Sequence, residues 1–265
     1  MKMEIQIKKA VKAGNSSAVI LPRSWLNKEV RVELIKKTPE VMLLEIISII
    51  KNYIEPNEII GIYLTGSYAR GEENKDSDID ILIITKETNR EVINEGLYNL
   101  TIVSEGLLKQ KLKEDLFPIG QMIRETIPLI NSDYLSKIEI KVTKENTEWY
   151  LTTTRSKLAI IKKVIEALKN KNKECASDKI AYTLILRIIT LNIIENLILG
   201  KAYSKKSIIK LIKRITKGKK AFERYLAVKN NLEDKEGISL REIEELYNYL
   251  TDYLSKIELL LNLKR

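Results

Sequence analysis

The stretch IIGIYLTGSYARGEENKDSDIDILIIT, residues 59–85, decides the fold of this chain. Its two ends are apolar runs, which predict two neighbouring strands. The first run ends in the turn Gly66-Ser67, and the second opens with Asp78 and Asp80. Side chains alternate along a strand, so the two carboxylates are expected on one face, where oxygen ligands suit a divalent metal. The turn offers backbone N–H groups and a hydroxyl to a phosphate. The alternative is a strand–loop–strand whose carboxylates merely cap the loop.

Gly-Ser, ten residues and Asp-x-Asp together resemble the nucleotidyltransferase superfamily that includes DNA polymerase beta, and within it the small prokaryotic minimal enzymes. The resemblance implies that Asp78 and Asp80 bind Mg²⁺ (or Mn²⁺) and serve catalysis. It also implies that Gly66 and Ser67 hold the outer phosphates of a nucleoside triphosphate such as ATP. Two cations of the connecting loop are further candidates to offset phosphate charge, with plain surface charge as the alternative: Arg70 and Lys75.

Members of this superfamily usually carry a third carboxylate on a later strand. The matching position in this chain, on a strand expected over 98–103, is Asn99. An amide offers a neutral oxygen but cannot act as a base. Glu139, between Ile138 and Ile140 on a strand expected over 137–142, is an alternative third ligand. Without a third acid, the protein is slow, needs a substrate group, or binds nucleotide without turnover.

Composition narrows the chemistry further. The chain has 265 residues, 44% of them hydrophobic, which suffices for two or three compact units. It has no histidine, which excludes Ser-His and Cys-His catalysis and histidine metal ligands. Cys175 is the single cysteine, so no disulfide or cysteine zinc site forms within one chain. The apolar stretch 180–199 contains Arg187 and Glu195 and is interpreted as a buried helix, with no membrane partner. The N-terminus shows no secretory pattern, which predicts a cytoplasmic location.

Residues 1–37 are expected to form a small β segment with strands at 4–7, 18–21 and 30–35 and a turn at 12–17. The sequence VKAGNSSAVILPRSWL, residues 11–26, resembles the AbrB-like swapped-hairpin family. That resemblance implies a homodimer and, in many members, DNA binding. Residues 1–38 hold nine basic against three acidic residues. Four cations are candidate phosphate contacts, with a solvated surface as the alternative: Lys8, Lys9, Lys12 and Arg23.

The fold class predicted is α+β with three parts: an AbrB-like segment at 1–37, an α/β nucleotidyltransferase core with a mixed sheet at 38–142, and a helical bundle at 143–265. Thr38-Pro39 is expected to begin a helix that runs to about residue 53, with one apolar face made of Val41, Leu44, Ile47 and Ile50. Further helices are expected at 88–97, 104–113 and 119–126. The last part is expected to hold four or five helices, with Arg187 and Glu195 paired to each other or to neighbouring helices, or with Arg187 facing a nucleotide cleft.

The sequence therefore predicts a magnesium-dependent nucleotidyltransferase that moves a nucleoside monophosphate to a hydroxyl on a protein or small molecule and releases pyrophosphate. Residues 39–142 hold eleven basic against eighteen acidic residues, and residues 143–265 hold twenty-six against fifteen. A polycationic acceptor such as an aminoglycoside fits this basic periphery poorly. The alternative is a DNA-binding regulator in which the same fold senses a nucleotide.

Overall fold

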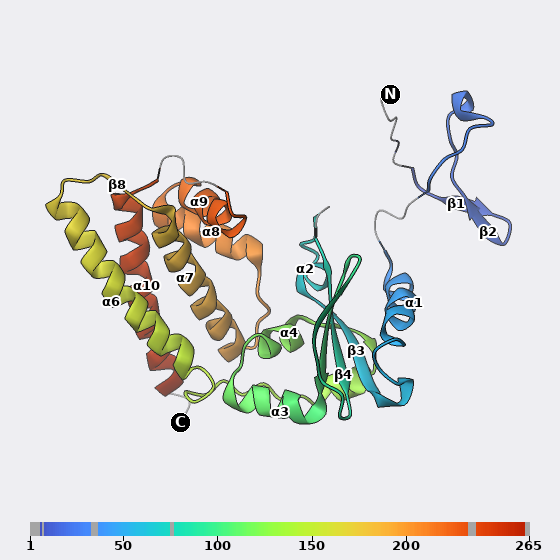
Figure 1. Cartoon of the computed structure of the whole chain (residues 1–265), viewed down its shortest axis with the longest axis horizontal. Coiled ribbons are helices and arrows are strands. Elements are labelled where there is room, and N and C mark those ends of the chain that lie inside the picture. The colour runs from blue at the N-terminus through green and yellow to red at the C-terminus, as the bar shows by residue number, and fades with distance from the viewer. Residues whose placement is uncertain (1–5, 7, 33–36, 75–76, 233–236, 263–265) are drawn as a thin grey trace. The chain divides into compact units, whose positions relative to one another are not determined.

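The computed structural model describes residues 6, 8–32, 37–74, 77–232 and 237–262. Contacts divide the chain into two compact units, residues 1–38 and residues 39–265 (Figure 1). The second unit contains both the sheet that carries the Gly66-Ser67 turn and the helical bundle.

The described residues of the first unit form one hairpin. Strand β1 (Val11–Ala13) pairs antiparallel with β2 (Ser16–Ala18) across a turn at Gly14, whose φ is +61°. A short 3-10 helix, η1 (Arg23–Trp25), follows. The expected strand at 18–21 is thus shifted to 16–18, and most of the one at 4–7 lies outside the described residues. No strand forms over residues 30–32, the described part of the strand expected at 30–35. Val30 and Val32 are exposed, so a strand there would have no core to pack against.

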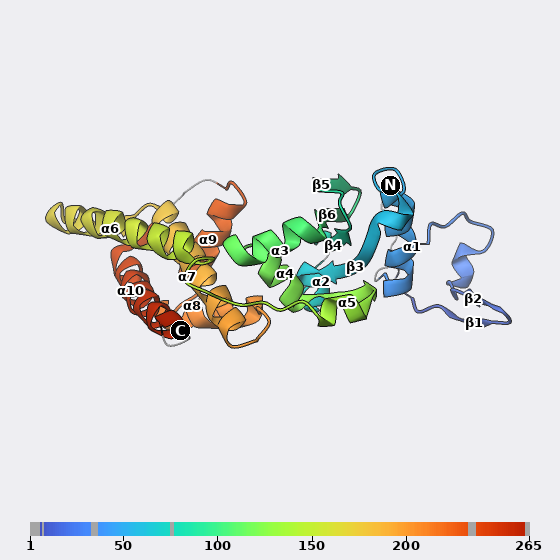
Figure 2. The same cartoon turned by 90° about the horizontal axis from the view of Figure 1, so that it is seen from below.

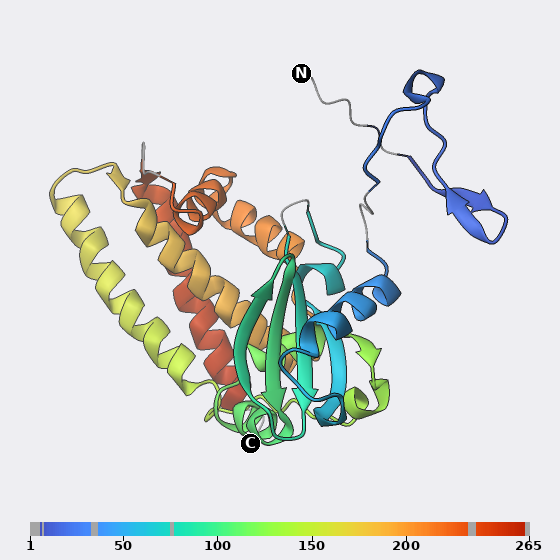
Figure 3. The same ribbon diagram turned by 45° about the vertical axis from the view of Figure 1, so that its right-hand side comes forward.

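The second unit begins with α1 (Pro39–Ile50), which starts at the expected proline. A five-stranded mixed sheet follows in the order β5-β6-β4-β3-β7 (Figure 3). Its strands are β3 (Ile59–Thr65), β4 (Ile79–Thr85), β5 (Arg90–Glu95), β6 (Tyr98–Ser104) and β7 (Ile127–Ile130). Strands β4 and β6 run parallel, and the other neighbours are antiparallel. The predicted mixed sheet is confirmed.

Helices cover both faces of the sheet. One face packs on α1 through Met42, Ile46 and Ile50. The other packs on α3 (Glu105–Glu114) and α4 (Ile119–Glu125) through Leu108, Ile119 and Ile123. Because both faces are covered, β4 is apolar at almost every position after Asp80. The expected apolar face of α1 is wrong in part: Leu44 is 70% exposed and Ile47 44% exposed, and the buried stripe lies at residues 42, 46 and 50.

Two further expectations between the strands are wrong. Residues 88–97 form no helix; they form β5, which returns as β6 through a tight turn at Gly96 and Leu97, with Gly96 at φ +59°. Residues 137–142 form no strand. Strand β7 occupies the free edge of β3 instead, followed by the short helix α5 (Ser132–Ser136). The alternating Ile138 and Ile140 pack against the α3–α4 core without joining the sheet.

The C-terminal bundle consists of five helices in the described residues, as expected (Figure 1). They are α6 (Glu148–Asn170), α7 (Asp178–Ile198), α8 (Lys205–Thr216), α9 (Lys220–Lys229) and α10 (Leu240–Asn262). The two-residue strands β8 (Cys175–Ala176) and β9 (Ile238–Ser239) pair at one end. Helix α7 is long and apolar enough to cross a membrane, yet it lies in the centre of the bundle core, where an apolar helix is expected without a bilayer.

Of the arrangements expected for Arg187 and Glu195, the structure shows contacts with neighbouring helices. The Arg187 guanidinium donates to Thr153 Oγ1 at 3.0 Å and lies over the ring of Trp149. The Glu195 carboxylate accepts from Lys256 and from Tyr253 Oη, both on α10. The two residues are eight positions apart on α7 and reach different neighbouring helices, which is the other arrangement that the sequence left open.

The sheet part and the bundle meet in a small apolar contact. Leu116, which follows α3, packs against Ile193 and Leu197 of α7. The chain then passes from α5 to α6 along an irregular segment (Figure 2). The start of α8 lies close to the turn that follows β3, where Glu72 accepts hydrogen bonds from it.

Candidate active site

Asp80 and Gly66 lie side by side at the end of the central strands. Thr65, the last residue of β3, is the cross-strand neighbour of Asp80 on β4. Gly66 follows with φ +68° and begins α2 (Gly66–Ala69). A Cβ atom on Gly66 would stand 2.0 Å from Asp80 Oδ2. Glycine is therefore required here both for the left-handed backbone and for the room that the carboxylate takes.

The surroundings of Asp80 disfavour its ionised form. Burial raises the pKa of the Asp80 carboxyl above its usual range, and the charge of Asp78 adds to this effect, whereas Asn99 and Arg70 oppose it. Asn99 is the neighbour of Asp80 on the parallel strand β6, and its Nδ2 donates to Asp80 Oδ1 at 3.3 Å. Asn99 Oδ1 is buried and has no hydrogen-bond partner among the described residues. Asp78 is exposed just before β4 begins.

These oxygens suit a hard divalent cation. Two carboxylates and one unpartnered amide oxygen belong to the donor set that Mg²⁺ prefers, and a cation would offset the repulsion between Asp78 and Asp80. No group of three His, Cys, Asp or Glu residues converges within the described ranges. This agrees with an asparagine at the place where a third acid was sought.

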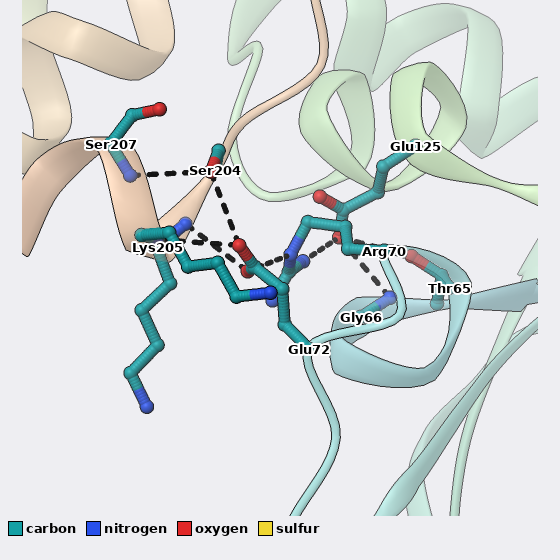
Figure 4. A network of polar contacts seen from close by, with 9 residues as sticks. Thr65, Gly66, Arg70, Glu72, Glu125, Ser204, Lys205 and Ser207 are labelled. Atoms are coloured by element: carbon teal, nitrogen blue, oxygen red, sulfur yellow. Dashed lines mark hydrogen bonds and ion pairs between the residues drawn. The ribbon is translucent and has the colours of Figure 1, made fainter.

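A buried glutamate accepts hydrogen bonds from the residues of the Gly66 turn. Glu125, at the end of α4, is 8% exposed, and its Oε1 accepts from Gly66 N at 3.1 Å and from Thr65 Oγ1 at 3.4 Å. The same oxygen pairs with Arg70 Nη1 at 2.7 Å (Figure 4). The backbone donor of Gly66 is thus engaged within the protein. Glu125 Oε2 is buried and finds no hydrogen-bond partner in the part of the chain that the structure describes.

A second glutamate connects the turn to the bundle. Glu72 Oε2 accepts from Arg70 Nε at 3.2 Å and from Lys205 N at 3.1 Å. Its Oε1 accepts from Ser204 Oγ at 3.1 Å and from Lys206 N at 3.3 Å (Figure 4). Burial raises the pKa of the Glu72 carboxyl, but these four hydrogen bonds outweigh burial and lower it. Arg70 also lies over the ring of Tyr203, the residue before Ser204.

The structure places the other candidates as follows. Ser67 is partly exposed on α2, and its hydroxyl makes no hydrogen bond to a described residue. Arg70 is in the loop as expected but is held by Glu72 and Glu125, with 15% of its side chain exposed. Lys75 lies outside the described residues. The Glu139 side chain is 75% exposed in an irregular segment and pairs with Lys141, so the expectation that it lies on a strand is wrong. The four cations of the first unit are all exposed: Lys8, Lys9, Lys12 and Arg23.

Sequence reasoning missed Glu72, Glu125 and Tyr203. Glu125 is 59 residues from Gly66 in the chain, and it follows Arg124 in a short polar stretch that shows no local sign of burial. Glu72 is one of two adjacent glutamates in a charged loop. The one usable signal was Ser204, a typical helix N-cap residue, since free amides at a helix start attract a carboxylate.

Comparison with known protein families identifies one matching domain. Residues 45–215 match the family described as the nucleotidyltransferase domain. A nucleotidyltransferase-like protein from Exiguobacterium sibiricum 255-15 is 18% identical, with a TM-score of 0.37, and the match covers 83% of this chain and 77% of that one. Spectinomycin adenyltransferase AAD(9) from Enterococcus faecialis, solved with ATP and spectinomycin, is 15% identical, with a TM-score of 0.38, and the match covers 80% of this chain and 99% of that one. No curated protein sequence matches the chain significantly.

Proposed function

We propose a nucleotidyl-transfer activity for this chain, which belongs to the nucleotidyltransferase domain family. In the proposed reaction it transfers a nucleoside monophosphate from a nucleoside triphosphate to an acceptor hydroxyl. In this proposal Asp78 and Asp80 hold Mg²⁺ or Mn²⁺, and pyrophosphate leaves. The observation that carries the proposal is the group of hard oxygens at one sheet edge: the crowded Asp80 carboxylate, the nearby Asp78, and the unpartnered Asn99 Oδ1.

Each residue has a definite task in the proposed reaction. A divalent cation, when bound, neutralises charge on the transferred phosphoryl group. Asp78 and Asp80 provide its anionic ligands, and Asn99 adds a neutral oxygen. The Ser67 hydroxyl donates to an outer phosphate. The positive charge of Arg70 stabilises the ionised form of Asp80 and lowers its pKa. No third described carboxylate joins Asp78 and Asp80 to serve as a base, so the acceptor hydroxyl must lose its proton to Asp80, to water or to a substrate group.

The charge of the helical bundle near the turn limits which acceptors can approach. The first residue of α8, Lys205, donates its N–H to Glu72 beside the turn. Residues 201–222 contain nine Lys and Arg and no Asp or Glu. Lys206, Lys210 and Lys217 on α8 and just after it are exposed. A polycationic acceptor would be repelled from this surface. We therefore favour a hydroxyl on a protein, or on a small molecule that is neutral or anionic.

A transfer assay tests the proposal. The wild type and the Asp78→Asn/Asp80→Asn variant are incubated with each labelled nucleoside triphosphate, Mg²⁺ and a lysate of the source cell, and labelled products and pyrophosphate are measured. We expect label on an acceptor and pyrophosphate release with the wild type and neither with the variant. Equal signals from both proteins, or no signal and no triphosphate binding by the wild type, would refute nucleotidyl transfer.

A second candidate is a DNA-binding regulator that senses a nucleotide through the same fold. Asn99 in place of an acid favours it, because an amide supplies no base. The exposed cations of the first unit, and apolar side chains such as Ile20 and Leu26 that its hairpin leaves exposed, suit DNA contact and a homodimer. A gel shift at several salt concentrations, with Lys8→Ala/Lys12→Ala as the variant, and the oligomeric state in solution test this candidate. No shift at low salt would rule out the regulator.

A further inference from the structure

The geometry points to a role for Glu72 that the nucleotidyl transfer proposed above does not itself assign. We propose that Glu72 is a positioning residue, which fixes the Gly66-Ser67 turn relative to helix α8. It joins the turn and the first turn of α8 by hydrogen bonds. This inference rests on the proposed function only for its activity readout.

On the bundle side, Glu72 contacts the beginning of α8. The first backbone N–H groups of a helix have no partner within the helix, and a carboxylate there is further favoured by the helix dipole. Glu72 accepts two of these N–H groups, from Lys205 and Lys206, and also the Ser204 hydroxyl. The Glu72 side chain is 7% exposed, so these bonds are shielded from water. Figure 4 shows the carboxylate facing the first turn of α8.

On the other side, Glu72 orients Arg70. The Arg70 guanidinium is held between Glu72 at Nε and Glu125 at Nη1. Glu125 in turn accepts the Gly66 N–H, and Gly66 touches the Asp80 carboxylate. A continuous set of contacts therefore joins the start of α8 to Asp80. Burial lowers the pKa of Arg70, but its two carboxylates outweigh burial and raise it, so the guanidinium stays charged.

Helix α8 has an N-cap of its own. Ser204 Oγ accepts from Ser207 N at 3.3 Å, which is the ordinary capping bond. Glu72 supplements this cap and in addition reaches the turn. The capping role and the positioning role can be separated by a substitution at position 204. A negatively charged residue there takes over the capping role of Glu72 but does not restore its contact with Arg70.

The test compares Glu72→Gln with Glu72→Gln/Ser204→Asp. The glutamine keeps the size of the side chain but loses the charge that orients Arg70, and the aspartate returns a negative charge to the start of α8. We expect Glu72→Gln to lower both Tm and kcat/KM for the nucleotide, the latter by about tenfold or more. In the double variant, Tm returns to the wild-type value while kcat/KM stays low. Recovery of kcat/KM together with Tm would mean that Glu72 only caps the helix, and would overturn the proposal.

The matched control is Glu148→Gln. Glu148 also lies in the first turn of a helix, α6, and pairs with an arginine, Arg155, at 3.5 Å. Its hydrogen bond and ion pair in the described residues stay within α6. We expect this variant to keep the wild-type kcat/KM. A loss equal to that of Glu72→Gln would show a general effect of helix-end charge and would overturn the specific role of Glu72.

Amide hydrogen exchange gives a readout that does not depend on turnover. In Glu72→Gln/Ser204→Asp, we expect faster exchange over residues 66–72 and unchanged protection over residues 205–207. Unchanged exchange in the turn would overturn the proposal whatever the activity. Should the wild type transfer no nucleotide while the turn still loosens as expected, nucleotidyl transfer would fail and the positioning contact would stand.

Discussion

The Asp80 carboxylate occupies the space in which Gly66 would carry a side chain, with Oδ2 2.0 Å from the position of a Cβ atom. Gly66→Ala should therefore displace Asp80 as well as strain the backbone at φ +68°. We expect a loss of about 1–2 kcal/mol in the free energy of unfolding from the backbone alone. We also expect a loss of activity of at least about a hundredfold from the displaced carboxylate.

Gly71 provides the matched control for that prediction. Its φ is also positive, +62°, but a Cβ there would meet nothing within 4 Å. Gly71→Ala should show a similar loss of stability by urea unfolding and retain most of the activity. Equal losses of activity in the two variants would show that backbone strain, and not the Asp80 contact, explains the need for glycine.

In the metal-free protein, the ionised Asp80 carboxylate should lower the stability of the fold. The pKa of Asp80 is raised in the folded state, mainly by burial and then by Asp78. The ionised carboxylate is therefore less favourable in the folded protein than in the unfolded chain. Stability from this group is present at acidic pH and is lost as pH rises through the folded pKa. We expect Asp80→Asn to raise Tm at pH 7 in EDTA by about 1–3 °C, and to abolish the further rise that Mg²⁺ gives the wild type. A lower Tm for the variant in EDTA would contradict this account.

Asn99 is the position at which the site differs from the expected set of acids. Asn99→Asp places a third carboxylate beside Asp80, which should lower stability in EDTA and raise Mg²⁺-dependent activity by about tenfold or more. Asn94→Asp is the control, because Asn94 is exposed on β5 directly opposite Asn99 and has the same side chain. Measurement of kcat with saturating Mg²⁺ decides: no gain at position 99, or the same gain at 94, would show that Asn99 does not limit the reaction.

The link between the turn and α8 should weaken in acid. Four hydrogen bonds lower the pKa of Glu72 despite its burial, from an ordinary value of 4.5. A lowered carboxyl pKa gives stability that is present above the unfolded-state pKa and is lost as pH falls through the folded one. We expect the Tm difference between the wild type and Glu72→Gln to be constant from pH 6 to pH 7 and to shrink below about pH 4.5. A difference that stays constant to pH 3 would contradict the assignment.

The parts of the fold that the sequence predicted are those with strong local signals. The apolar runs of β3 and β4, the Thr38-Pro39 helix start and the capped helices of the bundle each carry enough apolar periodicity or end chemistry to be recognised. Strand β5 was missed because residues 90–95 are mostly polar and pair only along the exposed edge of β6. The Gly96 turn was its one visible sign.

In the candidate site, too, the residues with local sequence signals were predicted and those with long-range contacts were not. The spacing from Gly66-Ser67 to Asp78 and Asp80 is local and was read directly, and the adjacency of Asn99 follows from parallel pairing of β4 and β6. Glu125 could not be placed, since its contacts with Gly66 and Arg70 join residues 59 and 55 positions apart. Likewise, the contact between Glu72 and Ser204 spans 132 positions and depends on how the bundle packs against the sheet.

The most direct measurement is magnesium-dependent binding of ATP by calorimetry, with the wild type and Asp78→Asn/Asp80→Asn compared in Mg²⁺ and in EDTA. The account predicts that the wild type binds ATP in Mg²⁺ at least about tenfold more tightly than in EDTA, and that the variant loses this difference. Equal affinities for the two proteins in Mg²⁺ would contradict the claim that these two carboxylates hold the metal that binds the nucleotide.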